Sequence, residues 1–117
     1  MKVVIVDDEW FGLDLTYRVL TQIRNDLEVV AFFQDPYEAL EQIPRLRPDL
    51  IILDFEMPYM NGMEVYEKLK ESGSNFMIVS AHGNSILKST TWNKKVGVLT
   101  KPFCKSDMSA VLNAMEL

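Results

Sequence analysis

Several short apolar runs of the sequence end at, or lead directly into, a side chain that can take part in chemistry. These side chains are Asp7, Asp8, Asp54, Ser80 and Lys101. Carboxylates that share one place repel each other, and an all-oxygen cluster suits a hard divalent cation such as Mg²⁺. A carboxylate beside Mg²⁺, a lysine and a hydroxyl is equipped for phosphoryl transfer. We therefore predict that Asp54 is a phosphoryl-accepting nucleophile. Lys101 would neutralise charge on the transferred group, and Ser80 would donate a hydrogen bond to one of its oxygens.

Each of these residues also has a purely structural explanation. Acidic residues such as Asp7 and Asp8 are favourable at the start of a helix, and Asp54 or Ser80 can satisfy backbone groups in a turn. Lys101 can be a solvated lysine beside a proline. Short motifs often match by chance, but four of five predicted strands deliver such a residue to one place, which favours a shared site.

Five apolar runs rich in β-branched or aromatic residues predict strands. They cover residues 2–6, 27–33, 50–53, 76–79 and 96–99. Their weak alternation of apolar and polar residues is typical of strands that are covered on both faces. Segments with helical spacing lie between and after the strands, at 10–24, from Asp35 onward, at 63–71 and at 105–116.

Two of the segments between the strands are less regular. Asp35 is a good N-cap for a helix, whereas Pro44 is expected to kink or stop that helix. Residues 84–94 are rich in Ser, Thr and Asn, so only a short or irregular helix is expected there.

Strands that alternate with helices predict a parallel sheet with right-handed crossovers. Five such units predict an α/β, flavodoxin-like (βα)5 fold: a doubly wound, five-stranded parallel sheet in the order 2-1-3-4-5, with helices on both faces. We expect residues 1–117 to form a single domain. In open α/β sheets the ligand crevice lies outside the carboxyl ends of the strands, where the five polar residues are expected.

Composition excludes several other classes of protein. The net charge is −5, without a long Lys/Arg run, which argues against direct nucleic-acid binding by this chain. The longest apolar runs are strand-sized, so no membrane span is expected. Cys104 is the single cysteine, which rules out an internal disulfide and fits a reducing, cytoplasmic compartment.

Four motifs resemble those of response-regulator receiver domains in bacterial two-component signalling. They are IVDDE (5–9), LDFEMPYMNG (53–62), VSA (79–81) and LTKPF (99–103). The resemblance covers essentially the whole chain. It implies that Asp54 accepts phosphate from a phosphohistidine on a sensor histidine kinase or a phosphotransfer protein. It also implies a signalling phosphoacceptor that catalyses its own phosphorylation and dephosphorylation, not a metabolic enzyme.

The resemblance implies a ligand set for Mg²⁺. Asp8, Asp54 and the backbone carbonyl of Glu56 would ligate the ion directly, and Asp7 would act through water. Lys101 would pair with the phosphoryl group, across a cis bond to Pro102.

Further residues carry roles by resemblance alone. Ser80 would swing toward the phosphoryl oxygen, and the side chains of Glu56 and His82 would tune dephosphorylation. Exposure of His82 to solvent without any role is an equal alternative.

One position departs from the family pattern. Receivers usually carry Tyr or Phe three residues before the lysine, where this chain has Val98. The output face, made of the 84–94, 96–99 and 105–116 segments, is therefore expected to switch by a different rearrangement. Ser80, Val98 and Trp92 are candidates for it, although a core or interface role is the simpler explanation for Trp92. A homodimer through the same face is compatible with the resemblance, and the output partner or covalent effector domain is not in this chain.

Three alternative functions remain open. A phosphohydrolase of the haloacid-dehalogenase type would place its nucleophile after the first strand, and a flavodoxin would need a phosphate loop where DDEW (7–10) stands. A pseudo-receiver would bind partners without phosphorylation. Residues 35–65 faintly resemble receivers attached to LytTR-type DNA-binding domains, which would make the chain part of a longer transcription regulator; a stand-alone receiver is the other arrangement.

Overall fold

A five-stranded parallel sheet forms the centre of the molecule. The computed structural model describes residues 1–83, 85–86 and 96–117. The strands run in the order β2-β1-β3-β4-β5, as predicted. Their bounds are β1 Lys2–Val6, β2 Glu28–Phe33, β3 Leu50–Asp54, β4 Asn75–Ser80 and β5 Val96–Thr100.

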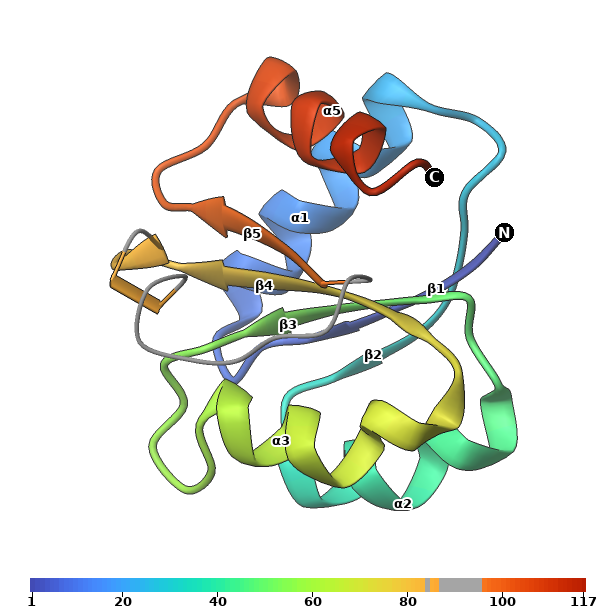
Figure 1. The fold of residues 1–117 in the computed structure, drawn as a ribbon, viewed down its shortest axis with the longest axis vertical. Helices are drawn as coiled ribbons and strands as arrows, with labels where there is room; N and C mark the ends of the chain where they lie inside the picture. Colours follow the sequence, from blue (N-terminus) through green and yellow to red (C-terminus); the bar gives the residue numbers. More distant parts are fainter. Residues whose placement is uncertain (84, 87–95) are drawn as a thin grey trace.

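Helices cover both faces of this sheet. In the described ranges these helices are α1 (Trp10–Ile23), α2 (Pro36–Leu46), α3 (Gly62–Leu69) and α5 (Lys105–Ala114), and the short η1 (Lys70–Ser72) follows α3. Helices α1 and α5 lie together on one face, and α2 and α3 lie on the other (Figure 1). The predicted doubly wound, flavodoxin-like fold is confirmed. The helix expected at 84–94 lies outside the described residues, apart from residues 85 and 86.

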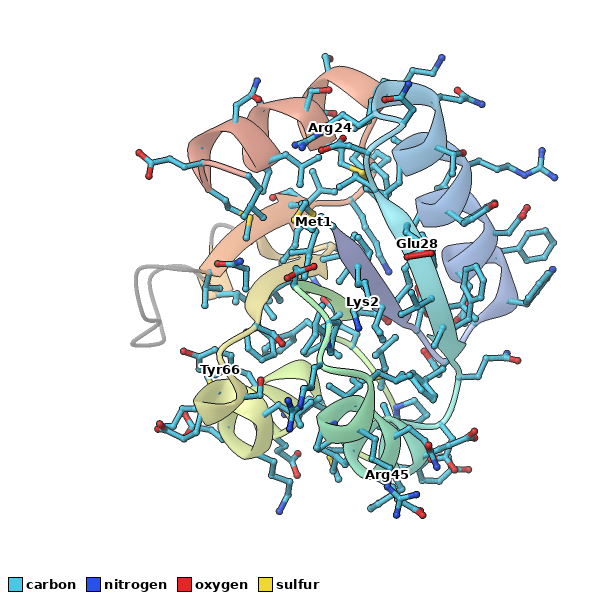
Figure 2. The ribbon with its side chains drawn as sticks, turned by 90° about the vertical axis from the view of Figure 1, so that its right-hand side faces the viewer. Met1, Lys2, Arg24, Glu28, Arg45 and Tyr66 are labelled. Atoms are coloured by element: carbon cyan, nitrogen blue, oxygen red, sulfur yellow. The ribbon has the colours of Figure 1, made fainter. Side chains whose placement is uncertain are left out.

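Alternate residues of each strand enter two separate cores. In β1, Val4 joins a core under α2 and α3, whereas Val3 and Ile5 join a core under α1 and α5. Successive side chains of a strand point to opposite faces, so a strand with helices on both sides must be apolar throughout. Figure 2 shows this arrangement from the side, with Lys2 of β1 and Glu28 of β2 lying between the two helix layers. The weak alternation in the sequence has this cause.

Local signals set the helix ends. Asp35 caps α2 by accepting a hydrogen bond from the Tyr37 N–H, as predicted. Of the two effects expected of Pro44, a kink or a stop, the stop is wrong, because the helix continues to Leu46. Pro44 lies in the last turn, where it removes only one backbone hydrogen bond. No helix in the described part of the chain is long and apolar enough to cross a membrane.

Helix α5 approaches β5 very closely at one glycine. A Cβ atom on Gly97 would lie 2.5 Å from Sδ of Met115 and 2.7 Å from Cγ1 of Val111. Both distances are far below van der Waals contact, so a side chain at position 97 would force the Met115 and Val111 side chains to move.

Candidate active site at the carboxyl edge of the sheet

The carboxyl ends of four strands bring the predicted site residues together. Asp7 follows β1, Asp54 ends β3, Ser80 ends β4, and Lys101 follows β5. Strand pairing continues beyond these ends, since the Lys101 N–H donates to the Ser80 carbonyl at 2.8 Å. A pocket of about 240 Å³ opens here. It is lined by Asp7, Glu9, Gly12, Asp54, Glu56, Ala81, His82 and Lys101.

Asp54 and Lys101 form an ion pair in this pocket. Nζ of Lys101 lies 2.8 Å from Oδ1 of Asp54, and Asp54 is only 5% exposed to solvent. The Lys101–Pro102 peptide bond is cis, as the resemblance implied. The lysine keeps partial contact with solvent, so its ammonium group can meet an incoming anion while it holds the carboxylate.

Three carboxylates meet at the same edge. Asp7, Asp8 and Asp54 each offer an oxygen atom, and these atoms lie within 4.8 Å of one another. Burial raises the pKa of Asp7. Burial also raises the pKa of Asp54, to about 6. The negative charge of Asp7 adds to the rise in pKa at Asp54, whereas the hydrogen bond and charge of Lys101 oppose it. Burial acts against the charge of Lys101, but its hydrogen bond to Asp54 and the nearby carboxylates raise its pKa overall. One ammonium group does not neutralise three carboxylates, and an all-carboxylate donor set fits Mg²⁺.

Ser80 is held by partners that the sequence alone did not predict. Its hydroxyl donates to Oε1 of Glu56 at 2.5 Å and accepts from the His82 backbone N–H at 2.9 Å. Ser80 is fully buried, whereas Glu56 and His82 are exposed at the rim of the pocket. Trp92 lies outside the described residues, and Val98 is half-buried in β5.

Sequence reasoning also missed Gly12, which lets α1 approach the acidic cluster. A Cβ atom on Gly12 would lie 1.8 Å from Oδ2 of Asp7. The other oxygen of Asp7 accepts the Glu9 N–H at 2.9 Å. A glycine inside a segment with helical spacing is unfavourable for the helix, and this cost was the signal that a close approach occurs there.

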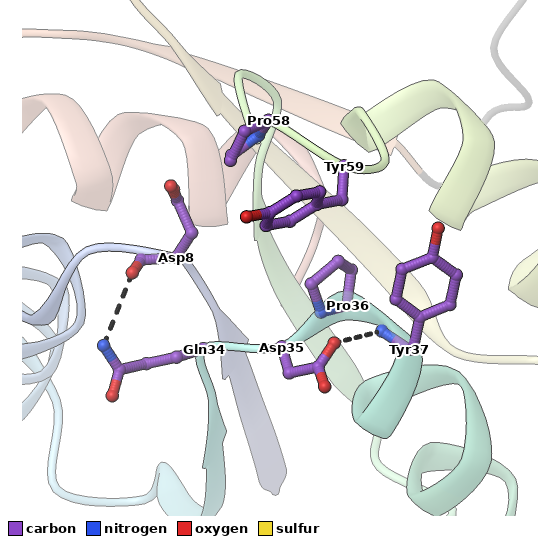
Figure 3. Close-up of a pocket in the computed structure, with 7 residues that line it drawn as sticks. All are labelled: Asp8, Gln34, Asp35, Pro36, Tyr37, Pro58 and Tyr59. Atoms are coloured by element: carbon purple, nitrogen blue, oxygen red, sulfur yellow. Dashed lines mark hydrogen bonds between the residues drawn. The ribbon is translucent and has the colours of Figure 1, made fainter.

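A second, larger pocket lies beside Asp8. It has a volume of about 490 Å³ and is formed by the loops after β1, β2 and β3 (Figure 3). The Gln34 side-chain amide donates to the Asp8 backbone carbonyl at 3.4 Å and so links two of these loops. The pocket is lined by Asp8, Gln34, Asp35, Pro36, Tyr37, Pro58 and Tyr59. Asp8 therefore borders open space on the α2 side of the acidic cluster.

Known proteins are similar to this chain in sequence and in architecture. The protein-glutamate methylesterase/protein-glutamine glutaminase of Thermotoga maritima is 32% identical over 106 residues, covering 87% of this chain and 30% of that protein. The two-component response regulator PhoP of Pseudomonas aeruginosa is 30% identical over 125 residues, covering 98% of this chain and 51% of that protein. The chain thus spans about half or less of these two relatives.

A solved structure gives the same result. The response regulator domain of Thermotoga maritima CheB superposes with a TM-score of 0.70 at 27% identity, covering 100% of this chain and 97% of that one. Residues 3–113 match the family described as the response regulator receiver domain. The match includes all four strand ends that form the pocket. The chain therefore belongs to the response regulator receiver domain family.

Proposed function

We propose that this receiver domain, comprising residues 1–117, accepts a phosphoryl group on Asp54 from a phosphohistidine of a sensor histidine kinase or phosphotransfer protein. The observation that carries the proposal is the buried Asp54 carboxylate, 2.8 Å from Nζ of Lys101 and beside two further carboxylates. Two rival functions have less support. A phosphohydrolase of the haloacid-dehalogenase type would place its nucleophile after the first strand, whereas Asp54 ends β3. A flavodoxin would need a phosphate-binding loop after β1, where acidic residues stand.

In the proposed reaction a carboxylate oxygen of Asp54 attacks phosphorus. The bond from phosphorus to the donor imidazole nitrogen breaks as the new oxygen–phosphorus bond forms, and its electron pair stays on the imidazole. Lys101 stabilises negative charge on the transferring group, and the Ser80 hydroxyl donates a hydrogen bond to a phosphoryl oxygen once the group is in place.

The acidic cluster would hold Mg²⁺ during this reaction. Asp8 and Asp54 would ligate it through their carboxylates and Glu56 through its backbone carbonyl, with Asp7 acting through water. Bound Mg²⁺ would neutralise charge on the phosphoryl oxygens. Burial of Asp7 and Asp54 next to each other supports this role, because both carboxylates gain from a cation nearby. Glu56 and His82, both at the pocket rim, would tune the later attack of water on the acyl phosphate.

The proposed output is a change of the face that includes β5 and α5. This face would contact an output partner, a covalently attached effector domain or a second copy of the chain. The named relatives are longer than this chain, which supports an attached effector. Net charge −5 supports the proposal that the chain does not itself bind nucleic acid. A single cysteine, exposed at Cys104, supports a cytoplasmic location.

Intact-mass spectrometry with a small phosphodonor tests this function. We expect acetyl phosphate and Mg²⁺ to add one phosphoryl group to the wild-type protein, and Asp54→Asn to show none. EDTA should prevent the addition.

Asp49→Asn is a matched control at the other end of the same strand, where Asp49 accepts the Lys2 backbone N–H far from the pocket. It should be phosphorylated like the wild type. A wild-type protein that gains no mass under these conditions would instead favour the pseudo-receiver, which binds partners without phosphorylation.

A further inference from the structure

The single hydroxyl proton of Ser80 already takes part in a hydrogen bond. It is donated to Oε1 of Glu56, while the hydroxyl oxygen accepts the His82 backbone N–H at 2.9 Å. A serine hydroxyl has only one proton to donate, so Ser80 cannot serve Glu56 and a phosphoryl oxygen at the same time. We propose that Glu56 is a positioning residue that retains Ser80 in the unphosphorylated arrangement, and that a phosphoryl group on Asp54 must displace Glu56 to recruit Ser80. This inference rests on the proposed function.

The burial of Ser80 means that its hydroxyl needs a hydrogen-bond partner inside the protein. Ser80 is fully buried, and leaving a buried hydroxyl without a partner is costly. Ser80 therefore leaves Glu56 only when another acceptor becomes available. A phosphoryl oxygen on Asp54 would be such an acceptor, because both residues end neighbouring strands, with Asp54 opposite Val79 of β4.

Electrostatic repulsion would favour the displacement of Glu56 from Ser80. Glu56 lines the same pocket as Asp54, and its negative charge already acts against the ionisation of that carboxyl group. A phosphoryl group brings more negative charge to the pocket, so the repulsion of Glu56 increases. The Glu56 side chain is exposed and can turn toward solvent, where its charge is hydrated.

The hydrogen bond between Ser80 and the His82 backbone also links Ser80 to β5. The residue after His82 is Gly83, which is buried against that strand. A Cβ atom on Gly83 would lie 2.2 Å from Oγ1 of Thr100 and 3.2 Å from Cγ1 of Val98. Because the His82 N–H is bonded to Ser80, movement of Ser80 would shift a backbone segment that is in direct contact with β5. This route needs no large side chain at Val98.

The test measures the His82 backbone amide by ¹H–¹⁵N NMR and the affinity for beryllium trifluoride, a phosphoryl mimic, in the presence of Mg²⁺. In Glu56→Ala we expect the His82 amide of the metal-free protein to move toward its position in the wild-type complex with Mg²⁺ and the mimic. We expect the mimic to bind about tenfold more tightly, since a hydrogen bond to a charged partner no longer competes for Ser80.

Three matched variants separate the hydrogen bond from charge. Glu56→Gln keeps an acceptor oxygen and should leave the His82 amide close to its wild-type position. Glu9→Ala removes a carboxylate from the same pocket without a bond to Ser80, and should not move that amide. In a Ser80→Ala background, Glu56→Ala should no longer increase the affinity for the mimic. Gains that persist without the Ser80 hydroxyl would mean that Glu56 acts only through its charge.

Two outcomes overturn the inference in different ways. An unchanged His82 amide in metal-free Glu56→Ala would show that Glu56 does not position Ser80, even in a protein that is phosphorylated normally. A His82 amide that moves, in a protein that neither binds the mimic nor accepts phosphate, would overturn the proposed function and with it the displacement step.

Discussion

The Asp54–Lys101 ion pair, with 2.8 Å between Oδ1 and Nζ, joins two strands that are not neighbours in the sheet. Asp54 ends β3, Lys101 follows β5, and β4 lies between these strands. The pair therefore passes over the carboxyl end of β4, where Ser80 lies. One interaction thus holds both the candidate nucleophile and its counter-charge at the carboxyl edge of the sheet.

Removal of the Asp54 charge should stabilise the metal-free protein at neutral pH. Burial raises the pKa of Asp54 to about 6 in the folded state, from 3.8. The folded state then binds more protons than the unfolded state between about pH 4 and 6, so stability falls as pH rises through this window. We expect Asp54→Asn to add about 3 kcal/mol at pH 7.5, and less than about 1 kcal/mol at pH 4.

Urea unfolding of both proteins in EDTA at the two pH values measures this difference. Asp14→Asn is the control, because Asp14 is a more exposed acid that pairs with Arg18 on α1. A pH-independent effect of Asp54→Asn, or a loss of stability at pH 7.5, would contradict the prediction.

Lys101→Met should raise the pKa of Asp54 above its wild-type value. The hydrogen bond and the charge of Lys101 both favour the ionised carboxylate, so their loss leaves burial and the charges of Asp7 and Glu56 unopposed. NMR titration of the Asp54 carboxyl carbon measures the shift. Phosphorylation by acetyl phosphate should slow by about a hundredfold. Lys105→Met, at an exposed position that begins α5, should change neither quantity.

Mg²⁺ should stabilise the protein, and Asp8 should be required for this effect. A ligand that binds only the folded state adds about 2.7 kcal/mol at a concentration about 100 times Kd. The exposed Trp10, two residues after Asp8, provides the fluorescence signal for both binding and unfolding. Asp8→Asn should lose the increase in melting temperature, whereas Asp14→Asn should keep it. An equal response of all three proteins to Mg²⁺ would place the ion elsewhere.

Gly12→Ala should destabilise the protein and weaken Mg²⁺ binding, although alanine is the better helix former by about 1 kcal/mol. The added Cβ would lie 1.8 Å from Oδ2 of Asp7, so the Asp7 side chain or α1 must move. Thr21→Ala, on the exposed face of the same helix, should instead be neutral or slightly stabilising. Urea unfolding and Mg²⁺ titration of both variants measure the contrast. A stabilised Gly12→Ala protein with wild-type affinity for Mg²⁺ would be the contrary result.

The sheet and the location of the site can be predicted from sequence because both follow from local patterns. Apolar runs such as 50–53 have no polar face, which requires helices on both sides and hence parallel crossovers. The carboxyl ends of parallel strands share one edge, so Asp54 and Lys101 are expected near each other although they are 47 positions apart.

Interactions between loops are harder to predict. The bond between Ser80 and Glu56 depends on how the chain turns after β3, for which neither residue type gives a signal. Pro44 was misleading because its effect depends on how many turns of the helix follow it. Gly12 gave a signal, its poor helix propensity, but the partner it accommodates, Asp7, becomes known only from the packed structure.

The contact at Gly97 has a mechanical consequence for signalling. The side chains of Met115 and Val111 lie against Gly97, so a displacement of β5 would be passed to the α5 segment by direct contact. Strand and helix are therefore expected to move together, so that a change at the pocket which displaces β5 would also displace the surface formed by α5.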